Sequence, residues 1–200
     1  MRVISALFDS YEQAADAVRG LRDAGVRSED ISVVANNSEG YAVKDGDEVA
    51  EDASAGAGIG ALLGGAGGLA AGLGMIAIPG VGPVIAGGWL LATAVGAVAG
   101  AALGGVTGGI VGAMTEAGIR EDDAHLYAEG VRRGGTLVTA RVADDKAALA
   151  ETIIGKDRVD LAKRRVDYEQ EGWERFDEDA PAYTPEEVRD YRASYISPAI

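Results

Sequence analysis

The chain has 200 residues, enough for one domain or for one domain with an insertion. It carries 18 Lys and Arg against 32 Asp and Glu, and the formal net charge of -14 repels phosphate backbones, which argues against nucleic-acid binding. The absence of Cys excludes disulfides, thiol nucleophiles, Fe–S clusters and thiolate zinc sites, and a single His leaves no multi-His metal cluster.

Glycine and charge divide the chain into three parts. Residues 53–115 hold 20 of the 30 glycines and no Asp, Glu, Lys, Arg or His. The two flanks, 1–52 and 116–200, carry all the charge. The middle part also contains Leu, Ile and Val throughout, so it is not a Gly/Ser linker.

The N-terminal flank predicts a strand, a helix and a second strand. Residues 2–8 form a short apolar run with β-branched members, typical of a buried strand. Ser10 offers an N-cap with Gln13 as its capping-box partner, and the helix is expected to end near Gly25. Residues 30–35 read as the next strand, which completes a βαβ unit.

Residues 36–52 are polar and acidic, and we interpret them as a solvated loop. Asp45 and Asp47 have a spacing that faintly suggests a calcium loop. The Gly and the distal Glu of an EF-hand are not at the required positions, so a metal site here is the weaker alternative.

The C-terminal flank predicts helix, strand, helix and strand. The first helix opens at Glu121 and closes near Arg133, with acids at its start and bases at its end. Residues 136–142 alternate as a strand, Asp144 or Asp145 is expected to cap a helix that ends near Gly155, and residues 159–161 read as a short fourth strand.

Neither flank buries enough apolar surface to fold alone. Together they predict an α+β fold, a ferredoxin-like split βαβ head with two helices on one face of a four-stranded sheet. This head is discontinuous, with residues 1–52 and 116–162 on either side of an inserted segment, 53–115.

The flanks resemble a known family. Residues 3–37, VISALFDSYEQAADAVRGLRDAGVRSEDISVVANN, resemble the N-terminal unit of the bacterial general stress protein (heat-induced stress protein) domain family. Residues 118–145, GIREDDAHLYAEGVRRGGTLVTARVADD, resemble the segment that follows a hydrophobic insertion in larger members. The resemblance implies a stress-associated bacterial protein with no assigned reaction, so it supplies no catalytic residues.

The middle segment contains two series of small residues at a spacing of four. The first series is Gly56, Gly60, Gly64, Gly68 and Gly72, and the second is Gly88, Ala92, Gly96, Gly100, Gly104, Gly108 and Gly112. A turn containing Pro79, Gly80, Gly82 and Pro83 separates them. We interpret residues 55–78 and 84–115 as the arms of a glycine-zipper helical hairpin, with the two series as helix-packing surfaces.

Two environments could stabilise such a hairpin. Glycine costs about 1 kcal/mol relative to Ala in a solvated helix, so the arms must lie in lipid or pack inside a protein assembly. The arms are long enough to span a bilayer, which predicts an inner-membrane hairpin with both flanks cytoplasmic. Sparse large apolar side chains and acidic hairpin ends keep a water-soluble homo-oligomer open as the alternative.

The tail, residues 163–200, is acidic and rich in aromatic residues. Six aromatics are candidates for docking onto a neighbouring subunit or a membrane surface: Tyr168, Trp173, Phe176, Tyr183, Tyr191 and Tyr195. Packing on the chain's own domain is the alternative. Thr184 is expected to cap a short helix that begins at Pro185.

No catalytic machinery is visible. His125 lies among Asp122, Asp123 and Glu129 and is interpreted as a solvated surface residue. The run 177–179 offers at most a weak cation site, and the glycine-rich segment lacks the Lys of a phosphate-binding loop. We therefore predict a non-enzymatic protein with no cofactor, no metal, no small-molecule substrate and itself as partner. The leading hypothesis is a stress-associated membrane hairpin protein that self-associates, and the alternative is a soluble homo-oligomeric scaffold or shell protein.

Overall fold

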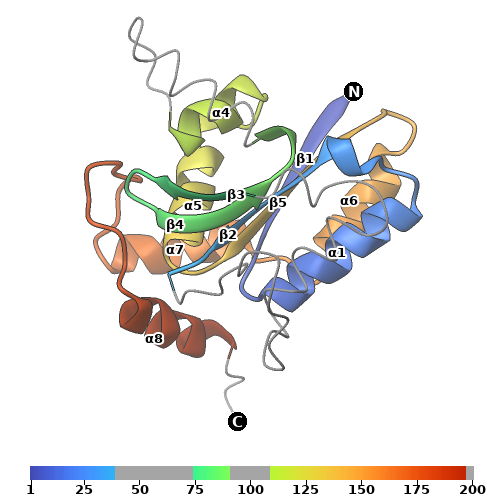
Figure 1. The fold of residues 1–200 in the computed structure, drawn as a ribbon. Coiled ribbons are helices and arrows are strands. Elements are labelled where there is room, and N and C mark those ends of the chain that lie inside the picture. The colour runs from blue at the N-terminus through green and yellow to red at the C-terminus, as the bar shows by residue number, and fades with distance from the viewer. Residues whose placement is uncertain (39–73, 91–108, 197–200) are drawn as a thin grey trace, which may run out of the picture.

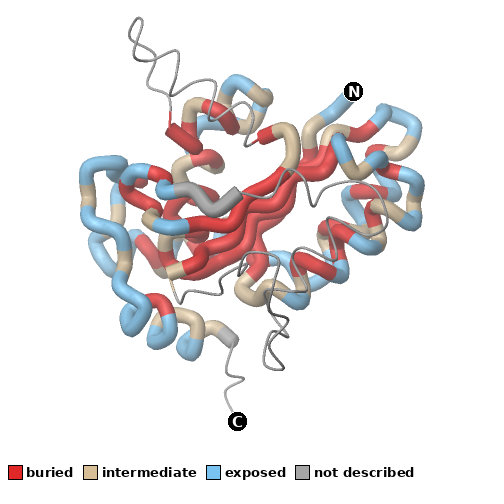
Figure 2. The backbone as a smooth tube through the Cα atoms, in the orientation of Figure 1, coloured by how far each residue is buried: buried red, intermediate tan, exposed pale blue. Residues whose placement is uncertain are grey.

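The computed structural model describes residues 1–38, 74–90 and 109–196, which form an α+β fold around a five-stranded antiparallel sheet. The strands lie in the order β1-β5-β2-β4-β3. Helices α1 and α6 cover one face of the sheet, and α4 and α5 cover the other (Figure 1). Figure 2 shows the central strands of the sheet as mostly buried, between helices whose outer sides are exposed.

The two flanks share one sheet, as their sequences predict. Strand β5 (Thr136–Val142) lies between β1 (Arg2–Phe8) and β2 (Ile31–Asn36) and is antiparallel to both, with Ala140 opposite Ile4 on one side and Ile31 on the other. Strands β1 and β2 are therefore parallel to each other and joined through α1 (Tyr11–Asp23).

Alternate residues of each strand build two cores. Ile4, Phe8 and Val138 face α1 and α6, whereas Leu7 and Leu137 face α4 and α5. Both faces are apolar because helices cover both, so the sheet does not show the one-sided polar pattern of a solvated sheet. The two helices expected on one face, α1 and α6, share that face, but the opposite face is covered as well, because α5 (Glu121–Arg132) packs on it.

The helix boundaries follow local chemistry. Helix α1 starts at a complete capping box, in which the Gln13 N–H donates to Ser10 Oγ and the Ser10 N–H donates to the Gln13 side chain. It ends before Gly25, which has a φ of 79°. Helix α6 (Ala147–Gly155) forms where it is expected, but its N-cap is Lys146 and no side chain caps it, so the predicted Asp144 or Asp145 cap is wrong.

The predicted helical hairpin is wrong for residues 74–87. These residues form two strands, β3 (Gly74–Ile78) and β4 (Gly82–Gly87), joined by a tight turn. Strand β4 pairs with β2, so the hairpin extends the sheet of the head. β-branched residues favour the extended backbone here, and positive φ values at Gly80 and Gly82, 71° and 95°, shape the turn.

The turn itself is predicted correctly, but its place in the fold is not. Val81 is fully buried in the core under α4 and α5, and its N–H donates to Ile78 O at 3.0 Å. Pro79 and Pro83 are exposed. The segment expected at the far end of a membrane hairpin is thus part of the folded head.

The glycine series falls mostly on residues 39–73 and 91–108, outside the described residues. Gly112 lies in α4 (Ile110–Glu116), a helix of 7 residues. Gly88 is not in a helix stripe, because it has a φ of 94° and follows β4 directly. No helix in the described part of the chain is long and apolar enough to cross a membrane.

The predicted fourth strand at residues 159–161 does not form. Val159 donates one backbone hydrogen bond to Leu7 O at 2.8 Å, along the outer edge of β1, and α7 (Leu161–Gln170) then begins. The side chain of Asp160 accepts hydrogen bonds from the N–H groups of Ala162 and Lys163. The cap starts a helix where the apolar pattern alone suggested a strand.

Candidate functional site

The aromatic tail packs against the head and forms the densest polar and aromatic cluster of the described residues. Tyr168 on α7 is fully buried, and its ring centroid lies 5.7 Å from Trp173 and 6.2 Å from Tyr191. Tyr191 in turn lies 4.9 Å from Tyr195, and both come from α8 (Pro185–Ile196). These contacts favour the alternative for the tail, packing on its own domain.

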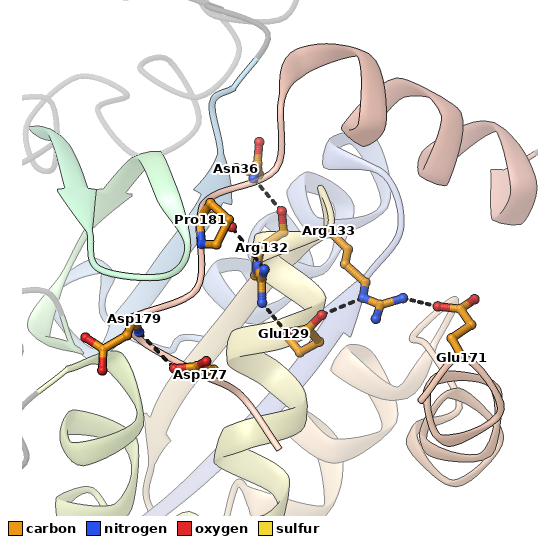
Figure 3. A network of polar contacts seen from close by, with 8 residues as sticks. All are labelled: Asn36, Glu129, Arg132, Arg133, Glu171, Asp177, Asp179 and Pro181. Atoms are coloured by element: carbon orange, nitrogen blue, oxygen red, sulfur yellow. Dashed lines mark hydrogen bonds and ion pairs between the residues drawn. The ribbon is translucent and has the colours of Figure 1, made fainter. Parts of the chain in front are cut away.

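Arg133 is the centre of this cluster. Its Nε donates to Glu129 Oε1 at 2.6 Å, and its Nη1 donates to Glu171 (Figure 3). Its guanidinium carbon lies 4.1 Å from the ring centroid of Tyr168 and 5.2 Å from that of Tyr191. One cation therefore ties α5, α7 and α8 together through ion pairs and cation–π contacts.

The electrostatics of Arg133 keep it charged. Burial by itself lowers its pKa, but the hydrogen bonds from the side chain to Glu129 and Glu171 outweigh burial and raise the pKa overall. Glu129 is only 1% exposed, so its carboxylate needs this partner.

A second buried arginine, Arg164, belongs to the same cluster, with its guanidinium carbon 5.9 Å from the centroid of the Tyr168 ring. Arg164 on α7 donates through Nη2 to both carboxylate oxygens of Asp9, each at 2.9 Å. Its guanidinium carbon lies 3.8 Å from the centroid of the Tyr195 ring. Asp9 follows β1, so this pair connects the first strand to the tail.

The end of α5 completes the cluster. Asn36 at the end of β2 donates its side-chain amide to Val131 O at 3.0 Å and to Arg132 O at 3.1 Å, which satisfies free carbonyls of the helix (Figure 3). From the tail, Arg192 Nε donates to Gly134 O at 2.8 Å. Val188 beside it is fully buried. Thr184 caps α8 as expected, its Oγ1 accepting from the Glu187 N–H.

His125 lies in a cleft beside this cluster. The cleft has a volume of about 850 Å³ and is lined by α4, α5 and the loop after α7, including Thr115, Glu121, Trp173 and Glu178. The His125 side chain is 13% exposed, with its Nε2 2.8 Å from Arg175 Nη2 and 3.7 Å from Glu121 Oε1. The prediction of a solvated His125 is wrong, because the loop 171–178 covers it.

The lining residues of the cleft pair His125 with Glu121 and Arg175 but with no nucleophile. Because a guanidinium only donates, His125 Nε2 accepts from Arg175 and is not free to take a proton from a substrate. The hydroxyl of Thr115 donates to Val111 O and Gly112 O within its own helix. Among the lining residues no nucleophile therefore has an adjacent base.

The described residues also contain no cluster of three His, Asp or Glu side chains that could hold a metal ion. In the acidic run, Asp177 Oδ1 accepts from the N–H of Asp179 at 2.9 Å, which makes it a turn. Asp45 and Asp47 lie outside the described residues.

Five of the six tail aromatics thus gather around Arg133 and Arg164, for which the sequence suggested no functional role. Phe176 is the exception, since it packs in the core under α4 and α5. Tyr183 lies 5.0 Å from the guanidinium carbon of Arg132. The spacing of four between Glu129 and Arg133 is a sequence signal for their pairing, whereas nothing local links Asp9 to Arg164.

In comparisons with models of protein families, with curated proteins and with solved structures, none was found to match this chain.

Proposed function

We propose that the chain is a non-enzymatic, stress-associated scaffold protein that assembles with copies of itself through its glycine-rich segments 53–73 and 91–108. The structure of the head supports this proposal in two ways. Ion pairs of Arg133 and Arg164 hold the tail against the head, and the residues that line its cleft include no nucleophile with an adjacent base. The resemblance to the general stress protein family remains part of the proposal, as does a ferredoxin-like arrangement of the strands that the two flanks supply.

One observation carries the choice of a scaffold over a membrane hairpin. The β3–β4 hairpin, residues 74–87, lies between the two glycine-rich segments and belongs to the sheet of the head. Each segment therefore has both ends attached to the head, the first between Ser38 and Gly74 and the second between Leu90 and Gly109. A single bilayer crossing needs its two ends on opposite faces, which these attachments oppose.

The glycine-rich segments supply the reason to assemble. They are uncharged and contain apolar residues such as Leu62, Leu63 and Leu103, which gain free energy when they leave water. The flanks are acidic and repel one another in solution. Contacts between copies are therefore expected at the uncharged segments.

Fractionation and sedimentation of the full chain test the proposal. The protein, expressed without detergent, should remain in the high-speed supernatant as a discrete particle larger than 20.4 kDa. Recovery in the membrane pellet would favour the membrane hairpin, and a monomer in the supernatant would contradict both versions.

A matched set of variants tests the surface. Gly100→Leu and Gly104→Leu place bulk on the predicted packing series and should reduce the particle to smaller species, with the head still folded by circular dichroism. Val98→Leu, off the series, should assemble like the parent. Equal assembly by all three variants would show that the glycine series is not a packing surface.

A further inference from the structure

The two edges of the sheet are protected very differently. At the outer edge of β1, Leu7 O accepts from the Val159 N–H at 2.8 Å, and Ser5 O accepts from the Tyr127 hydroxyl at 3.1 Å. Arg2 at the start of the strand is charged and pairs with Glu151 at 3.3 Å. Covering segments and charged residues are the usual means by which proteins prevent edge strands from pairing.

The outer edge of β3 has none of these protections among the described residues. Its sequence, GMIAI over Gly74–Ile78, contains no charged residue and no proline. No described strand pairs with its outer side, where it is the last strand of the sheet (Figure 1). Ala77 is exposed. An uncharged and unpaired edge is a template for another strand.

The register identifies the backbone groups on this edge. Pro83, opposite Ala77, has no N–H, and its carbonyl accepts from the Asn37 N–H at 2.8 Å on the β2 side. Pro83 therefore makes no hydrogen bond to β3, and Ala77 points its own N–H and C=O away from β4. The alternation of an antiparallel ladder gives Met75 the same direction.

Charge identifies a second copy as the partner. The net charge of -14 opposes contact between copies, yet the whole stretch 53–115 that contains β3 is uncharged. Among the described residues, the tail brings acidic residues to the turn of the hairpin, where a Cβ on Gly80 would lie 2.5 Å from Asp177 O and 2.8 Å from Glu178 Cα. These two residues lie at the turn end of β3.

This position of the acids selects an antiparallel pairing. Parallel alignment would bring the two acidic loops together, whereas antiparallel alignment separates them by the length of the strand. Five residues span about 17 Å at about 3.4 Å per residue, longer than the screening length of about 10 Å at 0.1 M salt.

We propose that the outer edge of β3 pairs antiparallel with β3 of a second copy, joining two five-stranded sheets into one across a two-fold axis. The inference rests on the proposed function in making a second copy the partner, but it uses a different surface. Main-chain hydrogen bonds from Met75 and Ala77 supply the contact.

Ala77→Pro tests this edge in the full chain. Its N–H points away from β4, so proline removes an outward donor and leaves the β3–β4 ladder intact. Sedimentation should show a complex with half the parent's number of copies. Ala77→Lys, which adds a charge to the edge, should do the same, and Ala77→Ser should assemble like the parent.

A second readout does not depend on these variants folding. The chain has no Cys, so a spin label can be placed at Ala77→Cys alone. Labels at this position should show strong dipolar coupling between copies, whereas a label at Leu149→Cys, exposed on α6, should show none. Absence of coupling at position 77 in an assembled sample would overturn the proposal, as would unchanged sedimentation of folded Ala77→Pro.

The variants separate this inference from the proposed function. If copies meet both at the edge of β3 and through the glycine series, the double variant Gly100→Leu with Gly104→Leu leaves a dimer. Adding Ala77→Pro to that variant then gives a monomer. If only the edge contact exists, the leucine variant keeps the parent's size while Ala77→Pro halves it. If only the glycine series assembles, Ala77→Pro keeps the parent's size and the edge proposal is wrong.

Discussion

The two halves of the sheet come from different parts of the chain and are held in different ways. Strands β1, β5 and β2 belong to the charged flanks, and buried ion pairs such as Arg133 with Glu129 and Arg164 with Asp9 anchor the elements around them. Strands β4 and β3 belong to the uncharged middle and depend on apolar packing and on glycine.

In the uncharged half of the sheet, a glycine is required locally, at position 88 after β4. Gly88 follows β4 with a φ of 94°, and a Cβ there would lie 2.3 Å from Ile31 O and 2.7 Å from Ser32 Cα. Beside it, Trp89 Nε1 donates to Asp30 O at 3.1 Å, and the Trp89 ring lies 4.9 Å from the guanidinium carbon of Arg141. A close approach of backbones, rather than helix packing, requires glycine at position 88.

The largest effect is expected at this position. Gly88→Ala should destabilise the head by about 4 kcal/mol, since a left-handed backbone costs about 1–2 kcal/mol and overpacking against β2 about 1–3 kcal/mol. In a helix, the same change would instead stabilise by about 1 kcal/mol. Urea unfolding shows whether Gly88→Ala lowers or raises the free energy of unfolding.

Gly118→Ala is the matched control. Gly118 has a φ of 92°, but a Cβ there would have no atom within 4 Å. Its cost should stay at about 1–2 kcal/mol, the backbone contribution alone. Equal losses for the two variants would show that Gly88 does not pack against β2.

The buried ion pair of the flanks should give the next effect. Arg133→Met leaves the Glu129 carboxylate buried with only Arg132, 3.4 Å away, and should cost about 3 kcal/mol in unfolding free energy. Glu129→Gln in the same chain should restore much of the loss, because the uncompensated charge is removed. Arg19→Met, at an exposed pair with Asp16, should cost less than about 1 kcal/mol. If Glu129→Gln restores no stability, the loss in unfolding free energy comes from the contacts of Arg133 with the tyrosine rings instead.

The smallest effect is expected at the helix caps of the flanks. Ser10→Ala removes the capping box of α1 and should cost about 1 kcal/mol. Asp145→Ala should change the stability little, because Lys146 and not Asp145 is the N-cap of α6. If Asp145→Ala lowered the unfolding free energy as much as Ser10→Ala, Asp145 would cap α6 as predicted from the sequence.

Local signals account for what could be predicted. The capping box at Ser10, the positive φ at Gly25 and the alternation of 136–142 identify α1 and β5 from short stretches of sequence. That β5 pairs with β1 and β2 agrees with the expectation that both flanks share one sheet, because neither flank buries enough apolar surface alone.

The hairpin could not be predicted from glycine spacing, because residues four apart share a face in a strand as well as in a helix. The spacing of four is also interrupted, because extending it from Gly72 to Gly88 passes through Ile76 and Val84, which are not small residues. These two β-branched residues are direct cross-strand partners in β3 and β4. The contacts of Arg164 with Asp9 and of Asn36 with α5 join residues far apart in sequence, so no local pattern indicates them.

One cross-link tests directly whether residues 74–90 belong to the sheet of the head. Val34 on β2 lies opposite Ala86 on β4, three positions along the ladder from the hydrogen-bonded pair of Asn37 and Pro83. Because hydrogen-bonded and non-hydrogen-bonded pairs alternate, Val34 and Ala86 form a non-hydrogen-bonded pair. Such pairs have Cα atoms about 4.5 Å apart, which suits a disulfide.

The chain has no Cys of its own, so Val34→Cys with Ala86→Cys gives an unambiguous result after oxidation of the folded protein. The account predicts an intramolecular disulfide formed as fully as in the flank control, Ser5→Cys with Thr139→Cys, which joins β1 to β5. A disulfide in the control and none between positions 34 and 86 would contradict the account.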